Sequence, residues 1–236
     1  MPSEVMWWHK PRWSQLELEA VAHAILDYLM VDTVLTVRQF QRRHGVKQDL
    51  VRAACKIPGT GIDYRTMAVH PLRGSSRKTR PELMSIGGIQ KPARVPYLLG
   101  LAEMRTLLSG ELSSWSSQLK NPWGISRRTL PAAVGEDQAS LPVAVDYHYG
   151  LLTRAQLAAK HRCLAASFPR VIWGVCGLLR AVEVAVLVPD AEVWCVSWET
   201  GEHVLVQKDG RFMMGSWSPG ECPCHGETHG PWHRKR

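Results

Sequence analysis

Apolar and polar positions follow a helical period in the first part of the chain. Ser14 with Glu17 three residues later is a capping-box pattern, which predicts the start of a helix. Five apolar residues then share one side of that helix: Leu18, Val21, Ala22, Ile25 and Leu29. Asp32 or Thr33 precedes a second short helix, which we expect to run to about His44.

A tight turn and a third helix are predicted next. Gly45 is the expected turn residue, because glycine adopts the positive φ that a sharp reversal needs. Four apolar residues of the third helix face inward: Val46, Leu50, Ala54 and Ile57. Residues 62–96 are predicted to be irregular, and a short extended segment at 91–99 leads into a helix at 101–109.

The second half of the chain has a different pattern. Helices are predicted at 152–161 and about 168–179, followed by β-type runs at 182–188, 192–198 and 203–207. Residues 110–145 mix Ser, Pro, Trp and Gly, and are predicted to connect two domains.

Positive charge is concentrated in one third of the protein. Residues 36–105 hold fourteen Lys and Arg against four Asp and Glu, whereas the rest of the chain holds fifteen against seventeen. A local positive field of this kind favours a polyanionic partner, most simply nucleic acid. It supports phosphate binding but does not distinguish DNA from RNA.

One short pattern occurs twice. Residues 35–44 align without a gap to residues 152–161, with Leu, Thr, Gln and His identical. In both segments the Thr (Thr36 or Thr153) can cap a helix whose Phe40 or Leu157 faces inward. The turn, the charge and this repeat resemble the winged helix-turn-helix DNA-binding superfamily over residues 16–109 and 146–210.

The resemblance implies roles for particular residues. Winged helix-turn-helix proteins read bases with the second helix of the motif, which here places Lys47, Gln48 and Arg52 on the reading face. Arg38, Arg42 and Arg43 would hold the phosphate backbone. Other basic residues of the same stretch extend the expected surface: Lys56, Arg73, Arg77, Lys78 and Arg80. The alternative is an ordinary basic helical hairpin with a solvated loop. The second copy is more apolar and is interpreted as a structural or protein-contact module.

The expected fold class is therefore α+β and mainly helical, with two small winged-helix-like modules and a C-terminal part rich in β-hairpins. The expected domains are a Trp-rich arm (1–13), a basic helix-turn-helix module (14–109), a linker (110–145), a second winged-helix-like module (146–212) and a flexible Cys/His-rich tail (213–236).

Candidate catalytic chemistry is sparse, so no enzyme is predicted. Pro189-Asp190 followed by Glu199 has the order of a metal-dependent nuclease, but the lysine expected two residues after Glu199 is Gly201. An inactive remnant or a plain turn is the preferred interpretation. No cofactor is expected, except that Cys222, Cys224, His225 and His229 are soft ligands that could hold zinc in the tail.

Cys55, Cys163, Cys176 and Cys195 lie in apolar contexts and predict buried free thiols, which favours a reducing cytoplasm. No run of residues is long and apolar enough to predict a membrane span. Two functions remain open. The first is a duplex-DNA-binding protein, regulatory or replication-associated, of a prokaryotic chromosome or mobile element, acting as a homodimer or with a protein partner. The second is an RNA- or single-strand-binding subunit of a ribonucleoprotein such as a CRISPR effector complex, where exposed tryptophans would dock on neighbouring subunits.

Overall fold

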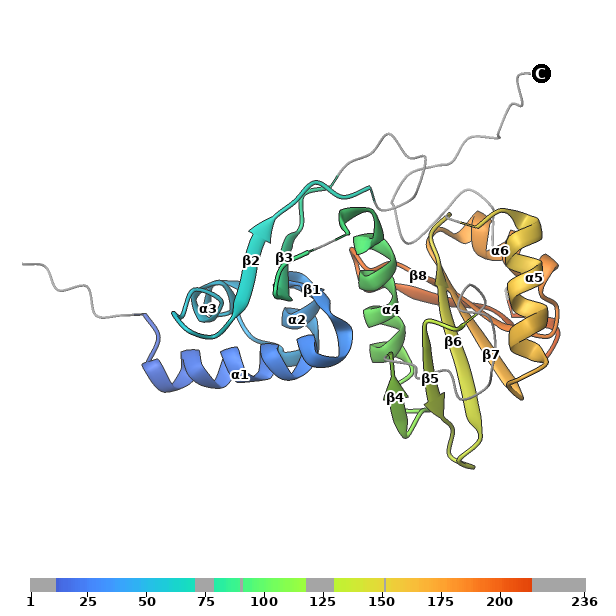
Figure 1. Cartoon of the computed structure of the whole chain (residues 1–236), viewed down its shortest axis with the longest axis horizontal. Helices are drawn as coiled ribbons and strands as arrows, with labels where there is room; N and C mark the ends of the chain where they lie inside the picture. Colours follow the sequence, from blue (N-terminus) through green and yellow to red (C-terminus); the bar gives the residue numbers. More distant parts are fainter. Residues whose placement is uncertain (1–11, 71–78, 90, 118–129, 151, 214–236) are drawn as a thin grey trace, which may run out of the picture.

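The computed structural model of the protein describes residues 12–70, 79–89, 91–117, 130–150 and 152–213. An N-terminal unit, a connecting helix and a larger sheet unit follow one another in these ranges (Figure 1). No helix in the ranges combines the length and the apolar character needed to cross a membrane.

The N-terminal unit contains three helices and a small sheet. Its elements are α1 (Gln15–Asp32), β1 (Val34–Thr36), α2 (Val37–His44), α3 (Gln48–Ala54), β2 (Ile62–Thr66) and β3 (Glu82–Ile86). The strands pair antiparallel in the order β1-β3-β2. Ile25, Phe40, Val51 and Met84 fill the core between the helices and the sheet. The expectation of an irregular segment over 62–96 is therefore wrong, because β2 and β3 form an antiparallel pair within it.

Helix α4 (Val95–Leu107) lies between the two units, preceded by the short 3-10 helix η1 (Pro92–Arg94) (Figure 1). It contacts β1 on one side and β6, β7 and β8 on the other. The extended segment expected at 91–99 is helical from Pro92 onward instead. Pro96 is compatible with this because the first turn of a helix needs no backbone N–H from that residue.

The sheet unit contains seven strands and two further helices. Its elements are β4 (Ser114–Ser116), β5 (Ala133–Glu136), β6 (Pro142–His148), α5 (Arg154–Ala165), β7 (Arg170–Val175), α6 (Leu178–Leu187), β8 (Glu192–Val196), β9 (His203–Lys208) and β10 (Arg211–Phe212). The spatial order is β10-β9-β8-β7-β6-β5-β4. The three central strands, β6, β7 and β8, are parallel, and the outer strands are antiparallel to their neighbours.

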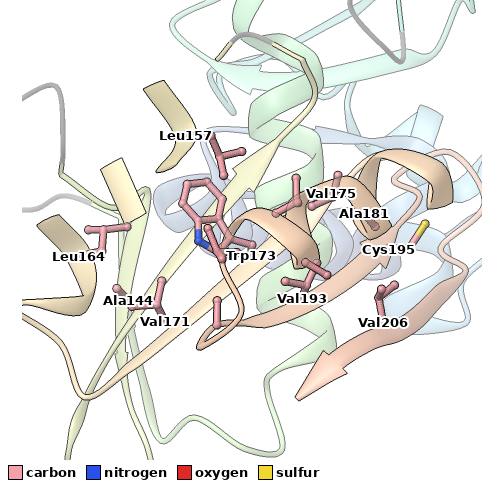
Figure 2. Close-up of a cluster of buried hydrophobic side chains, with 14 of the residues drawn as sticks. Ala144, Leu157, Leu164, Val171, Trp173, Val175, Ala181, Val193, Cys195 and Val206 are labelled. Carbon is pink, nitrogen blue, oxygen red and sulfur yellow. The ribbon is translucent and has the colours of Figure 1, made fainter. Parts of the chain in front are cut away.

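Helices cover both faces of this sheet. On one face, α5 and α6 pack on Val171, Trp173 and Val175 of β7 (Figure 2). On the other face, α4 packs on Val145 and Tyr147 of β6. Because the central strands are buried on both faces, the sheet unit is a three-layer α/β arrangement.

The expected fold class is wrong in two respects. The protein is not mainly helical, since ten strands accompany six α-helices in the described residues and seven of the strands form one sheet. Residues 146–212 are not a second winged-helix-like module either. They share the seven-stranded sheet with β4 and β5, which come from the segment expected to be a linker.

Two elements of the sheet unit were also assigned the wrong type. The apolar stretch predicted as a helix at 168–179 contains the central strand β7, and the Val-rich run predicted as a strand at 182–188 belongs to α6. A strand buried on both faces is apolar at every position, which removes the alternation that marks a strand. In α6 the buried residues are Leu178, Ala181, Val184 and Ala185, which follow the helical period.

One tryptophan joins the two units. Trp198 follows β8 and is only 2% exposed. Its side chain belongs to a buried cluster with Val34, Leu83 and Leu99, which come from β1, β3 and α4. The N-terminal unit is thus packed directly on the end of the large sheet.

Candidate nucleic-acid interface

Helix α2 begins and ends with strong local signals. Thr36 is its N-cap: Gln39 N donates to Thr36 Oγ1 at 2.9 Å, and Thr36 N donates to Gln39 Oε1 at 3.0 Å. Gly45 ends the helix in the left-handed conformation, at φ 66°. These two signals set where α2 begins and ends, and Arg38 is exposed in its first turn.

A pocket of about 420 Å³ lies where α2, α3, the start of β3 and the turn after β8 meet. Four of the residues expected to bind nucleic acid line it: Arg38, Gln48, Arg52 and Arg80. The rest of the wall comprises Thr36, Val37, Thr79, Pro81 and Trp198, together with two acidic residues, Glu82 and Glu199. Three arginines and a glutamine that lie up to 42 positions apart in sequence therefore converge on one polar hollow.

Arg52 is held in place by acidic neighbours. Its Nε and Nη2 donate to the carboxylate of Glu82 at 2.9 and 2.8 Å, and Nη1 donates to Asp49 Oδ1 at 3.1 Å. The hydrogen bonds from Arg52, acting against partial burial, lower the pKa of Glu82. Tyr64 also donates to Glu82, and burial together with that carboxylate raises the pKa of Tyr64 to about 12. The charge of Arg52 is thus largely neutralised by Glu82.

Gln48 belongs to the same network. Its Oε1 accepts from Arg52 Nη2 at 3.1 Å, and its Nε2 donates to Gln41 at 2.8 Å. Arg38 and Arg80, by contrast, are exposed and have no ion pair with any described residue. Unpaired guanidinium groups at the rim of a polar pocket are suited to phosphate oxygens.

Further positive charge flanks both ends of α3. Lys47 and Lys56 are exposed, and Lys47 Nζ lies 5.9 Å from the ring centroid of Trp13. Arg12 stacks on the same ring and pairs with Asp49 at 2.8 Å. Arg12 and Trp13 were not among the expected site residues, although their sequence, a cation next to an aromatic residue, is typical of nucleic-acid-binding segments.

Arg42 and Arg43 do not face the pocket. Arg42 pairs with Glu103 of α4 and donates to the carbonyl oxygens of Trp198 and Glu199 at 3.2 Å each. Arg43 is buried and pairs with Asp32 at 2.9 Å. Both were expected to contact the phosphate backbone. In the structure their contacts tie α2 to the rest of the protein.

The other expected sites divide into two groups. Arg73, Arg77 and Lys78 lie outside the described residues, as do the four candidate zinc ligands Cys222, Cys224, His225 and His229. Asp190 and Glu199 are described, and they lie beyond opposite ends of β8. At about 3.3 Å per residue, a five-residue strand holds them too far apart to share one metal ion.

Asp190 has a different partner. His161 Nε2 lies 2.8 Å from Asp190 Oδ1, and Trp173 Nε1 donates to His161 Nδ1 at 3.3 Å. The second hydrogen bond makes Nδ1 an acceptor, so Nε2 carries the proton and donates to Asp190. Burial raises the pKa of Asp190, but the hydrogen bonds from His161 and its own backbone outweigh that effect and lower it.

Three of the described thiols are buried and protonated. The described residues contain four free cysteines, of which Cys55, Cys176 and Cys195 are buried and Cys163 is half-buried. Burial raises the pKa of each of the three buried thiols to about 12, so they stay protonated. No cluster of three or more metal-binding side chains occurs in the described part of the chain.

Comparison of the chain with protein-family models, with curated proteins and with solved structures gives no match. The function is therefore inferred below from the geometry of the site.

Proposed function

We propose that the protein binds nucleic acid, with duplex DNA as the favoured partner, through α3, the first turn of α2 and the β2–β3 hairpin. The observation that carries this proposal is the convergence of Arg38, Gln48, Arg52 and Arg80 on one pocket. The exposed guanidinium groups of Arg38 and Arg80 provide donors for phosphate oxygens, whereas Arg52 and Gln48 are held in the network of Glu82.

The arrangement of the N-terminal unit supports the proposal. Three helices are followed by an antiparallel hairpin, and a short strand between α1 and α2 completes the sheet in the order β1-β3-β2. This arrangement resembles winged helix-turn-helix domains, in which the helix corresponding to α3 enters the major groove. The exposed Lys47 and Lys56 flank the two ends of α3, and Arg65 and Arg80 lie on the hairpin.

The proposed role is binding without catalysis. Asp190 hydrogen-bonds to His161, and Glu199 lies beyond the other end of β8. The three buried thiols are protonated. These features supply neither a metal-binding pair of carboxylates nor an activated nucleophile.

The test is a fluorescence anisotropy titration of the full chain with duplex DNA, single-stranded DNA and RNA of one sequence at three salt concentrations. We expect preference for the duplex and a steep salt dependence. Changing Arg38, Lys47 and Arg80 together to Gln should lower the slope of log K against log salt by about one for each phosphate contact that is lost.

A matched control variant makes the same change in net charge, but on the sheet unit. Arg162, Lys208 and Arg211 are changed together to Gln, which should leave both the affinity and the salt slope unchanged. If the control loses as much affinity as the first variant, binding depends on total charge and the proposed face is wrong. A preference for single strands or RNA, with a monomeric protein by light scattering, would favour the ribonucleoprotein subunit over a DNA-binding dimer.

A further inference from the structure

A second pocket, of about 250 Å³, lies in the sheet unit and shares no lining residue with the first. It opens at the carboxyl end of β6, between the start of α5 and one side of α6. Open α/β sheets bind their ligands beyond the carboxyl ends of parallel strands. β6 and β7 are parallel, so the pocket lies at the edge of the sheet where such ligands bind.

A histidine and an arginine at this pocket have neither a hydrogen-bond partner nor an ion-pair partner for their side chains among the described residues. His148, the last residue of β6, is 6% exposed, and Arg180 of α6 is half-buried. In the described part of the chain neither side chain makes a hydrogen bond or an ion pair. Neither side chain is among the fully buried polar atoms that lack a hydrogen-bond partner, so their polar atoms stay accessible at the pocket that both residues line.

His148 is fixed and neutral. Cys176 N donates to the His148 carbonyl oxygen at 3.1 Å, which anchors the end of β6 to β7. Burial, followed by the positive charges of Arg180 and Lys160, lowers the pKa of His148 to about 4. At neutral pH the ring therefore offers one N–H donor and one acceptor.

The other charges near the pocket are already paired. Arg154 pairs with Glu183 at 3.2 Å, and Lys160 pairs with the buried carboxylate of Asp146. Arg180 is left as an uncompensated guanidinium. The oxygen of Thr153 accepts the backbone N–H of Gln156, so its hydroxyl proton is available as a donor. This end of the pocket thus presents donors and a positive charge.

The remaining wall is apolar, being formed by Leu152, Leu157, Val184 and Leu187. The volume equals that of about eight water molecules at ~30 Å³ each. We propose that this pocket binds a small organic oxyanion, a carboxylate or phosphate monoester, whose charged group pairs with Arg180 and His148 and whose apolar part lies against the leucines. A guanidinium with an adjacent N–H donor matches the paired oxygens of such a group.

The test is isothermal titration calorimetry of the full chain with benzoate and with phenyl phosphate, which share a ring and differ in the anion. Benzyl alcohol, which has the ring without the charge, and inorganic phosphate, which has the charge without the ring, are the comparison probes. We expect submillimolar binding of one or both ring-bearing anions and at least tenfold weaker binding of both comparison probes. Inorganic phosphate binding as tightly as phenyl phosphate would show that the apolar wall contributes nothing and would overturn the proposal.

Two variants test whether the anions bind at this pocket. Arg180→Gln should weaken the tighter probe at least tenfold, because a charge-assisted hydrogen bond is lost. Arg162→Gln, on the exposed side of α5, should have no effect. A shift of the His148 ring proton signals in the NMR spectrum during the titration is expected as well.

Either of two results rejects the proposal: no heat and no shift with any ring-bearing anion at 10 mM, or unchanged affinity in Arg180→Gln. Since Arg180 is half-buried, circular dichroism of the variant verifies its fold. The titration contains no nucleic acid, so its outcome is independent of the proposed function.

Discussion

Arg43 and Asp32 form an ion pair inside the protein, with Nη1 2.9 Å from Oδ2 and with side chains only 4% and 3% exposed. Arg105 of α4 binds the same carboxylate, with Nε and Nη2 at 2.8 and 2.7 Å. Both guanidinium groups also lie over the ring of Tyr28. The C-terminal ends of α1, α2 and α4 are thus joined at one buried carboxylate.

Changing Arg43 to Ala should therefore reduce stability rather than the affinity for nucleic acid. Removal of one partner from a buried ion pair costs about 3–5 kcal/mol, and the remaining Arg105 places the expected loss at the lower end of that range. Urea unfolding measures it. The slope of log K against log salt for nucleic-acid binding should stay unchanged for the folded fraction of Arg43→Ala. Arg38→Ala should instead lower that slope and leave the stability unchanged. A stable Arg43→Ala protein with a reduced salt slope would show that this residue contacts phosphate after all.

The carboxylate of Glu82 should lower the affinity of the protein for nucleic acid. Its carboxylate neutralises Arg52 at the pocket, so Glu82→Gln removes a negative charge and leaves Arg52 available for phosphate. We expect several-fold tighter binding and a salt slope steeper by about one. In the wild-type background Arg52→Gln should change binding little. Anisotropy titrations of both variants decide the matter, and equal affinities for wild type and Glu82→Gln would contradict the prediction.

Gly100 permits α4 to approach the sheet. A Cβ at this position would lie 2.0 Å from the ring of Tyr147, whose hydroxyl donates to the Val196 carbonyl oxygen at 3.0 Å and keeps the ring in place. Gly100→Ala should therefore destabilise the protein by about 3 kcal/mol, although alanine favours a helix by about 1 kcal/mol. Gly110→Ala is the matched control, because no atom lies within 4 Å of its Cβ. Thermal or urea unfolding compares the two variants, and a stabilised Gly100→Ala protein would contradict the close contact.

His148 should make the protein less stable in mild acid. Its pKa is about 4 in the folded protein and near 6.5 in the unfolded chain. Between these values the unfolded chain binds the extra proton, so stability falls as the pH is lowered through this window. From pH 7.5 to pH 5 the loss from this residue is about 2 kcal/mol. Urea unfolding at the two pH values should show a smaller loss in His148→Gln, and identical losses would exclude a strongly lowered pKa.

Local signals were sufficient to predict the first three helices. The capping box at Ser14 and Glu17 and the left-handed turn at Gly45 are present as expected. The repeated pattern also holds at the level of caps, since Thr36 and Thr153 each cap a helix through a capping box. These features depend on residues three or four positions apart, which is why the sequence contains them.

The sheet unit could not be predicted in the same way. Its strands pair residues far apart in the chain, and β7 has no alternation because both of its faces are buried. The burial of Arg43 was equally hidden, because its partners Asp32 and Arg105 lie on other helices. A run of basic residues contains no information about which of them face a distant carboxylate.

The insertion of Trp198 among Val34, Leu83 and Leu99 has a consequence for how the protein is made. The N-terminal unit ends at Ile86, yet its core is completed by a side chain more than a hundred residues later. At about 5–20 residues per second, a ribosome takes roughly ten seconds to cover that interval. During that time the apolar surface that Trp198 later covers is exposed on the nascent N-terminal unit and accessible to chaperones. A gene fragment that stops before Trp198 encodes a unit in which this surface is exposed permanently.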